Sequence, residues 1–143
     1  MAMLGGVRDE AQTDEYMERN LRHWAEYGFG TWLLRDRGDL RVVGRAVLRH
    51  LRVENADEIE VGYGFHPAEW GRGLAQEITG ACLGYARDAL QAASVVALTH
   101  PDHVRSQRVL TRVGMVYDRE VEEEGKRLAL FRTAPGWLKH GRP

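Results

Sequence analysis

The strongest constraint on the fold is a short turn with two glycines that joins a strand-like segment to a helical one. Residues 69–75 read Glu-Trp-Gly-Arg-Gly-Leu-Ala, and an amphipathic pattern begins at Leu74. Gly71 and Gly73 permit positive φ angles and leave the peptide N–H groups uncovered. The first N–H groups of a helix lack intrahelical partners and carry the positive end of its dipole. The turn therefore predicts a phosphate site, to which Arg72 adds a charged donor.

Two commoner phosphate loops are absent from the sequence. No Gly-Lys-Ser or Gly-Lys-Thr ending of a Walker loop occurs in the chain. Gly62 and Gly64 are followed by 65–67, Phe-His-Pro, so the third glycine of the Rossmann pattern is missing. A glycine pair before a helix is also a common turn without a ligand, and on this segment alone that interpretation stays open.

Length, charge and cysteine content limit the class of protein. At 143 residues we expect one domain, 1–143. The 20 basic and 21 acidic residues nearly cancel, so nucleic acid is not an expected partner. No apolar run approaches the roughly 20 residues that cross a bilayer, so no membrane partner is expected and the cytoplasm is the predicted location. The single cysteine, Cys82, fits a buried thiol in a reducing compartment.

A metal site is not predicted. The best candidate among the six histidines is the segment 100–103, His-Pro-Asp-His. Pro101 breaks the helix that would bring both imidazoles to one face, and no other ligand cluster lies close in sequence.

Hydrophobic periodicity predicts an α+β fold with a mixed, mostly antiparallel sheet flanked by helices. The expected elements are a helix from an N-cap at Thr13 to Gly28, strands at 31–35, 41–51 and 58–65, a helix from Leu74 to Ala89, a strand at 94–99, a helix at 103–113 after an N-cap at Asp102, and a hairpin of 115–121 and 127–133.

A second motif identifies a family resemblance. Residues 99–115 read Thr-His-Pro-Asp-His-Val-Arg-Ser-Gln-Arg-Val-Leu-Thr-Arg-Val-Gly-Met. Together with 58–81 they resemble the two acetyl-CoA-binding motifs of the GNAT N-acetyltransferase superfamily, and Trp-Gly-Arg-Gly resembles its RimJ/RimL-type branch. Ser106, Arg108, Val109, Leu110 and Gly114 match the second motif, whereas His103 stands in place of an asparagine. Its ring nitrogen can replace the asparagine amide as a hydrogen-bonding group, so the contact to the pantetheine arm is either kept by His103 or lost.

The resemblance implies an enzyme that transfers an acetyl group from acetyl-CoA directly to a primary amine on a protein N-terminus or a small molecule. An α-amino group, with a pKa near 8, is easier to deprotonate than lysine, with a pKa near 10.4. The residues implied in cofactor binding are Phe65, His66, Pro67, Trp70, Gly71, Arg72, Gly73, Leu74, Ala75, His103 and Ser106.

The resemblance also implies two catalytic residues. Glu60 corresponds to a strand glutamate of the RimJ/RimL type and is the expected general base, although an outward-facing carboxylate beside Glu58 fits its position as well. Many family members protonate the leaving thiolate with a tyrosine, but Leu110 occupies that position. The acid is then Ser106, Tyr117 or water, and Ser106 is the expected one from its position in the motif. Alternatively, Ser106 only makes a hydrogen bond on its helix. A non-catalytic CoA-binding module is the alternative to an enzyme, favoured by Leu110 and His103.

The start of the chain differs from the family pattern. Members ordinarily begin with a strand and further helical residues, whereas only 1–12 precede the first helix here. Either the sequence starts at an internal methionine or the sheet has lost its first strand. In the second case 31–35 is an edge strand, and we expect a homodimer in which a neighbouring chain or residues 2–7 cover it.

Aromatic residues near the first helix have two possible roles. Trp24, Tyr27, Phe29 and Trp32 either wall an acceptor cleft or belong to the core.

Overall fold

The computed structural model describes residues 10–139 of the chain. The elements are α1 (Glu10–Tyr27), β1 (Thr31–Arg35), β2 (Val42–Val53), β3 (Ala56–Phe65), the 3-10 turn η2 (Pro67–Glu69), α2 (Leu74–Asp88), β4 (Val96–Thr99), α3 (Val104–Arg112), β5 (Met115–Glu123) and β6 (Lys126–Thr133).

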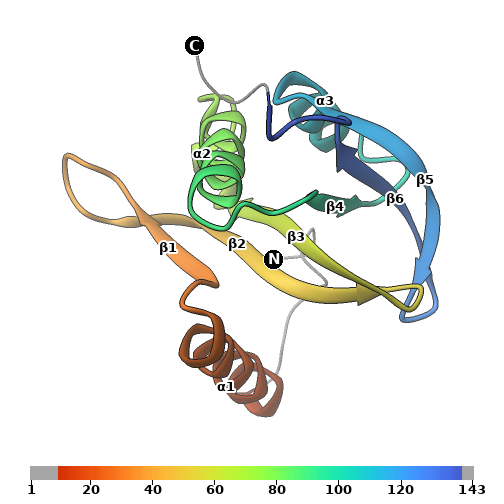
Figure 1. The fold of residues 1–143 in the computed structure, drawn as a ribbon. Helices are drawn as coiled ribbons and strands as arrows, with labels where there is room; N and C mark the ends of the chain where they lie inside the picture. Colours follow the sequence, from red (N-terminus) through yellow and green to blue (C-terminus); the bar gives the residue numbers. More distant parts are fainter. Residues whose placement is uncertain (1–9, 140–143) are drawn as a thin grey trace.

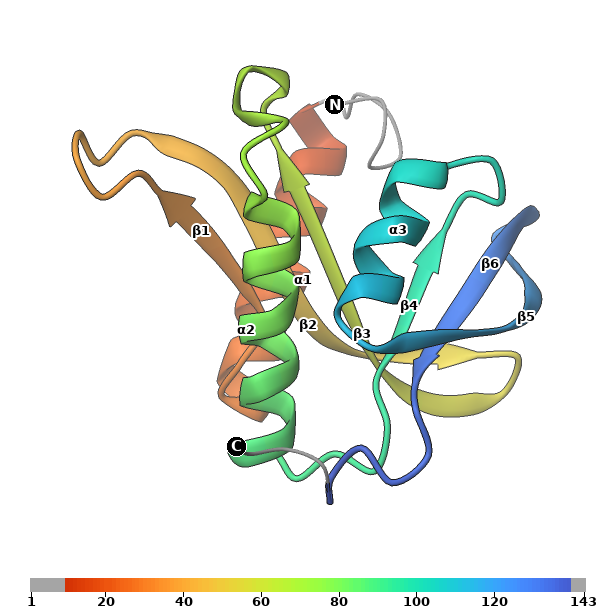
Figure 2. The same cartoon turned by 90° about the horizontal axis from the view of Figure 1, so that it is seen from above.

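The six strands form one sheet in the order β1-β2-β3-β4-β6-β5. Only β3 and β4 pair in parallel, and the other neighbours are antiparallel. The helices α2 and α3 cover one face, and α1 lies on the other (Figures 1 and 2). The expected α+β fold with a mixed, mostly antiparallel sheet is therefore confirmed, and β1 lies at the sheet edge as predicted. Residues 2–7, which were expected to cover that edge, lie outside the described residues.

The parallel pair separates almost as soon as it forms. Glu60 opposite Val96 is the single register position that β3 and β4 share. β3 then continues to Phe65 and β4 to Thr99, and Figure 2 shows the two strands diverging toward their carboxyl ends beside α3. The sheet thus contains a wedge-shaped gap between two adjacent strands.

Most of the core lies between the sheet and α2. Cys82, Leu83 and Ala86 of α2 pack against sheet residues that include Leu48 and Val61, all nearly inaccessible. Burial raises the pKa of the Cys82 thiol to about 11, which agrees with an inert core cysteine. Alternation along the strands sends a smaller cluster, Val53, Val96, Val121 and Leu130, to the opposite face.

Helix α1 is attached mainly by hydrogen bonds, because it has no buried residue. Thr31 Oγ1 donates to Asn20 Oδ1 at 2.7 Å, and Trp24 Nε1 donates to the Thr31 carbonyl at 3.0 Å. His23 joins the helix to the sheet by accepting from the His50 N–H at 2.9 Å. None of the helices in residues 10–139 has the length and apolar character needed to cross a bilayer.

Three predicted boundaries were wrong. Thr13 lies inside α1, which begins at Glu10, because the residues before it are good helix formers. The N-cap of α3 is His103 and not Asp102: His103 Nδ1 accepts the Ser106 N–H at 3.1 Å. The strand expected at 94–99 starts only at Val96, because the Val95 N–H donates to the side chain of Thr133 at 3.1 Å instead of to a ladder carbonyl.

Candidate active site

The gap between β3 and β4 exposes the edge of a strand. The His66 N–H donates to the Val43 carbonyl of β2 at 3.0 Å. Because peptide groups alternate in direction along a strand, those of Tyr63 and Phe65 face the gap. Trp70 Nε1 donates to the Phe65 carbonyl at 3.1 Å, so one acceptor at the end of this edge already has a partner. An extended ligand could pair with the rest of the edge as an added strand.

The turn before α2 has the backbone predicted from its glycines. Gly71 has a φ of 84° and Gly73 a φ of 74°, and a Cβ added at either position would meet nothing within 4 Å. Gly73 is the N-cap of α2 and provides no side-chain cap. The first intrahelical bond runs from the Glu77 N–H to the Gly73 carbonyl, so the N–H groups of Leu74 and Ala75 have no partner within the helix and would stabilise an anion.

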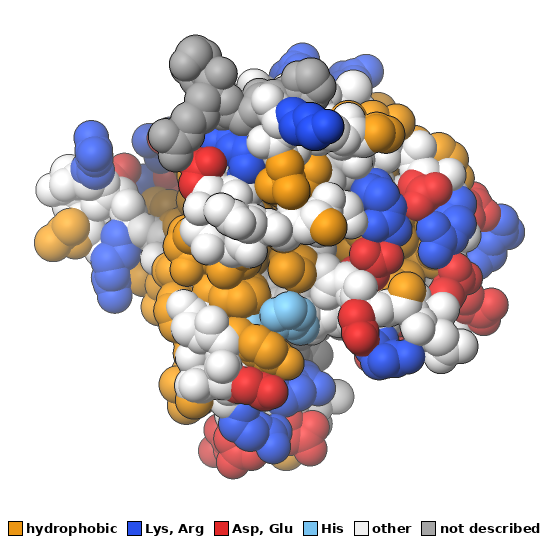
Figure 3. All heavy atoms as spheres, viewed as in Figure 1, with side chains coloured by type: hydrophobic (Ala, Val, Ile, Leu, Met, Phe, Trp, Pro, Cys, Tyr) orange, Lys and Arg blue, Asp and Glu red, His pale blue; other side chains and the backbone are white. Residues whose placement is uncertain are grey.

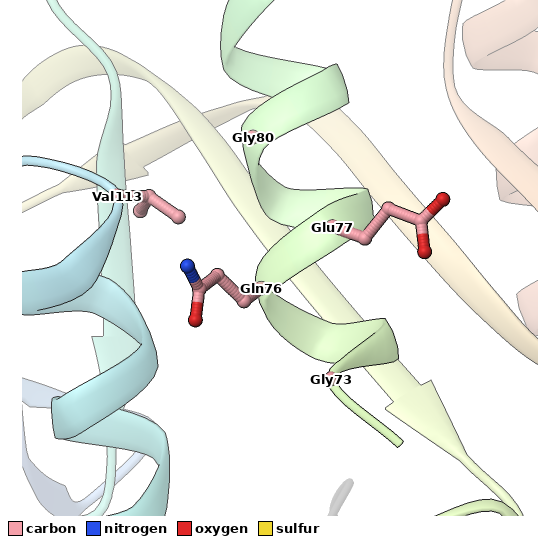
Figure 4. A pocket seen from close by; sticks show the side chains of 5 residues that line it. All are labelled: Gly73, Gln76, Glu77, Gly80 and Val113. Atoms are coloured by element: carbon pink, nitrogen blue, oxygen red, sulfur yellow. The ribbon is translucent and has the colours of Figure 1, made fainter.

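A shallow groove of about 580 Å³ runs from this turn between α2 and α3. Its lining residues are Gly73, Gln76, Glu77, Gly80 and Val113. Figure 4 shows Gln76 and Val113 pointing into the space between the helices, whereas Glu77 points away. Gly80 costs the helix about 1 kcal/mol relative to alanine, but it leaves this side of α2 without a side chain. The groove therefore leads from the uncapped helix end past α3.

Arg72 is held by carboxylates rather than left free. Its Nη1 donates to Glu69 Oε1 at 2.5 Å, and its Nη2 lies 3.8 Å from Asp36 Oδ2. Glu69 also accepts two hydrogen bonds from Arg41, at 2.9 and 3.0 Å. These bonds, chiefly those from Arg41, lower the pKa of Glu69 below its usual value of 4.5. The network fixes the turn against β2, and any phosphate contact from Arg72 starts from this anchored position.

Trp70 brings the two predicted motifs together. Its ring lies 5.4 Å from the guanidinium carbon of Arg105, on the first turn of α3. The residue is 44 % exposed, so the ring forms part of the outer wall of the site. His66 and Pro67 lead from β3 into η2 at the same end of the sheet.

Tyr63 is a functional candidate that sequence reasoning missed. Its hydroxyl lies 3.1 Å from Ser106 Oγ, and burial raises the pKa of the phenol. Leu110, at the position where many relatives carry a tyrosine, is 2 % exposed and belongs to the core. The alternation that puts Val61 in the α2 core puts Tyr63 on the same face, and this is the signal that could have found it.

Glu60 lies on the opposite face of the sheet from Ser106. Its Oε1 accepts from Arg49 Nε at 2.7 Å, and its side chain is 13 % exposed. Glu58, on the same face, is held by Arg132 through two hydrogen bonds of 3.0 and 2.8 Å. The two glutamates therefore differ in accessible charge, because only Glu58 is held by a two-pronged guanidinium contact.

The four aromatic residues near α1 differ in burial. Phe29 is buried in the core at 3 % exposure, and Trp32 packs against that core. Trp24 makes an edge contact with Trp32, with ring centroids 5.5 Å apart. Tyr27 is 42 % exposed and lies beside the ring of His50. Within residues 10–139, no three His, Cys, Asp or Glu side chains are arranged to hold a metal ion.

Comparison with known proteins identifies the family. Residues 1–116 match the family model described as acetyltransferase (GNAT) domain. The chain is 31 % identical over 131 residues to the uncharacterized protein YkkB of Bacillus subtilis (strain 168), covering 92 % of this chain and 76 % of that protein.

Solved structures share the fold. A putative GnaT-family acetyltransferase from Bordetella pertussis superposes with a TM-score of 0.80 at 24 % identity, covering 89 % of this chain and 78 % of the other. A ribosomal-protein-S5-alanine acetyltransferase from Vibrio fischeri superposes with a TM-score of 0.74 at 15 % identity, covering 96 % and 79 %. Because the family model matches residues 1–116, which is most of the chain, the chain belongs to the GNAT acetyltransferase family.

Proposed function

We propose that this acetyltransferase moves the acetyl group of acetyl-CoA directly to a primary amine, without a covalent enzyme intermediate. The observation that carries the proposal is the continuity of the site. An uncapped helix N-terminus behind Gly71 and Gly73 opens into a groove and a strand gap, and an acid and a base candidate lie on the two faces of that gap.

The geometry supports a set of cofactor-binding residues. The diphosphate of CoA fits the N–H groups of Leu74 and Ala75, with Arg72 beside it. The pantetheine arm fits along the free edge of β3 near Phe65, where an amide can pair as a strand would. The ring of Trp70 then bounds the site on the side of α3.

The chemistry requires proton transfers on both sides of the sheet. Glu60, on the face toward α1, takes the proton of the attacking amine directly or through a water. Ser106, on the face toward α3, gives its hydroxyl proton to the departing thiolate while it takes a proton from the Tyr63 hydroxyl 3.1 Å away. Solvent then reprotonates the Tyr63 phenolate and accepts the proton that Glu60 took. The buried phenol therefore replaces the tyrosine that Leu110 cannot supply. Acetyl-CoA contributes the thioester carbonyl.

The acceptor class and the branch of the family are proposals of the same kind. The Trp-Gly-Arg-Gly sequence and the likeness to an S5-alanine acetyltransferase support a RimJ/RimL-like enzyme. The acceptor is then an α-amino group of a peptide or a small molecule. Balanced charge argues against nucleic acid or a membrane as partner, and the buried thiol of Cys82 supports the cytoplasm as compartment.

A homodimer is the proposed assembly. β1 pairs on one side only, with β2, and Leu33 on this strand is 66 % exposed. Figure 3 shows hydrophobic side chains gathered between α2 and α1, over the region of β1. Tyr27 and Tyr85, 42 % and 39 % exposed, add to the apolar area near this edge. Pairing of two β1 edges would satisfy the free backbone groups and cover these side chains.

The rival is a CoA-binding module without catalysis. It draws support from the core position of Leu110 and from the use of His103 Nδ1 as a helix cap. The Tyr63 to Ser106 contact favours the enzyme, because a purely structural pair does not need two hydroxyls at the strand gap.

Release of free CoA thiol from acetyl-CoA tests the proposal on three amine classes: peptides with free N-termini, amino acids and polyamines. We expect amine-dependent release with at least one class. Tight binding of acetyl-CoA without release above the hydrolysis control, for every class, would support the rival module.

A further inference from the structure

One arginine on the α1 face of the sheet has no carboxylate partner within residues 10–139. Arg45 of β2 donates through Nη1 to the hydroxyl of Tyr16 and lies 5.0 Å from the centroid of its ring. Its Nε is buried without a hydrogen-bond partner. On the same face, Arg49 is paired with Glu60 and Arg132 with Glu58. Among the described residues, no carboxylate therefore compensates the charge of the partly buried Arg45 guanidinium.

The strand beside Arg45 carries glycines where side chains would face it. Its register partner on β3 is Gly64, and Gly62 precedes it on the same face, so β3 presents no side chain between Arg45 and Glu60. A Cβ added at Gly62 would meet only Val47, at 4.0 Å. Glu60 lies four residues before Gly64, which is about 13 Å along a strand. A peptide acceptor of about four residues, at up to about 3.6 Å per residue when extended, can therefore reach from Glu60 to the guanidinium with its other end.

The energetics favour an anion at this place. A guanidinium that is partly removed from water without a counter-charge is unfavourable, and an orphaned buried N–H adds to the cost. A carboxylate matches the planar donor fork of arginine with two parallel hydrogen bonds. A cationic acceptor such as a polyamine would instead be repelled.

We propose that Arg45, with Tyr16 of α1, binds a carboxylate carried by the acceptor, so that the enzyme acetylates amines bearing a free carboxyl group. The inference rests on the proposed function, since it names the acceptor class of that site. Arg45 contacts the substrate away from the reacting atoms, and its effect is on which amine is used.

The test compares peptides that differ only at the carboxyl end. Tetra-alanine and tetra-alanine amide, with the corresponding pentapeptide pair, present α-amino groups of similar pKa, so the free carboxylate is the variable. We expect kcat/KM to be at least about tenfold higher for the acids, because only the acid can form charged hydrogen bonds with the guanidinium. Arg45→Met should bring the ratio of acid to amide to within about twofold, and Arg45→Lys should keep part of the preference.

Controls separate this inference from the proposed function. The melting shift produced by acetyl-CoA should be the same in Arg45→Met, Arg45→Lys and the wild type, which also shows that the variants fold. If no amine is acetylated, the proposed function fails, and calorimetry with N-acetyl-alanyl-alanine against its amide still tests Arg45 by binding.

Three results would overturn the inference: equal use of acids and amides by the wild type, an unchanged preference in Arg45→Met, or tighter binding of inorganic phosphate than of N-acetyl-alanyl-alanine to the CoA-bound protein in calorimetry. The last result would assign the site to a phosphate.

Discussion

Exchanging Gly73 for asparagine or aspartate separates the charge of a phosphate site from its shape. The two side chains are nearly equal in size, and both tolerate the left-handed backbone that Gly73 adopts at a φ of 74°. A Cβ at this position meets nothing within 4 Å. Both variants should therefore fold, with a similar loss of roughly 1 kcal/mol from the backbone conformation.

The difference between the variants comes from electrostatics. A carboxylate about 5 Å from a phosphate charge is repelled by about 3 kcal/mol at an effective dielectric constant of about 20. Ionic screening reduces this value at physiological salt. We therefore expect acetyl-CoA to bind Gly73→Asp about 100-fold more weakly than the wild type, and Gly73→Asn about tenfold more weakly because it adds only bulk.

The assay is the melting temperature with and without acetyl-CoA at about 100 times the wild-type Kd. At that concentration the ligand adds about 2.7 kcal/mol to the free energy of unfolding. An unfolding entropy of about 0.3 kcal/mol per kelvin for a chain of this length converts the gain into a shift of about 9 °C. Gly73→Asn should shift by about 5 °C and Gly73→Asp by about 1 °C. Equal shifts in the two variants would refute a diphosphate at this helix end.

Three further changes test the catalytic groups and the anchored turn. Glu60→Gln should lower kcat by about 100-fold or more with little change in acetyl-CoA affinity. The matched control Glu58→Gln should reduce stability and leave the chemical step nearly intact. The reverse pattern would make Glu60 a structural residue. Tyr63→Phe should lower kcat by about tenfold or more with unchanged acetyl-CoA binding, and a wild-type pH–rate profile in this variant would remove the phenol from the proton path. The hydrogen bonds from Arg41 lower the pKa of Glu69. The stability that these bonds contribute is therefore complete above pH 4.5 and is lost as the pH falls below that value. The melting temperature should drop more steeply below pH 4.5 in the wild type than in Glu69→Gln.

The local features of the site could be predicted from the sequence because they depend on neighbouring residues. The positive φ angles of Gly71 and Gly73 follow from a strand that turns directly into a helix. The strand register of Glu58 and Glu60 follows from alternation. Both predictions need only a few consecutive positions.

The contacts that sequence reasoning missed join distant segments. Glu69 and Arg41 are 28 positions apart, and Tyr63 and Ser106 are 43 apart. No periodicity relates such pairs, so the anchoring of Arg72 and the phenol beside Ser106 appear only once the sheet is assembled. The cap at His103 was missed for a different reason: aspartate is the commoner N-cap, and Asp102 stands one residue too early.

The account depends most on direct transfer of the acetyl group to an amine. Mass spectrometry after a single turnover with deuterium-labelled acetyl-CoA follows that group, using enzyme in excess over alanyl-alanine. We expect the label in the acetylated peptide, one CoA released for each product formed, and no labelled enzyme at early times. Bound acetyl-CoA with no label in any amine, or label that first accumulates on the protein, would contradict the account.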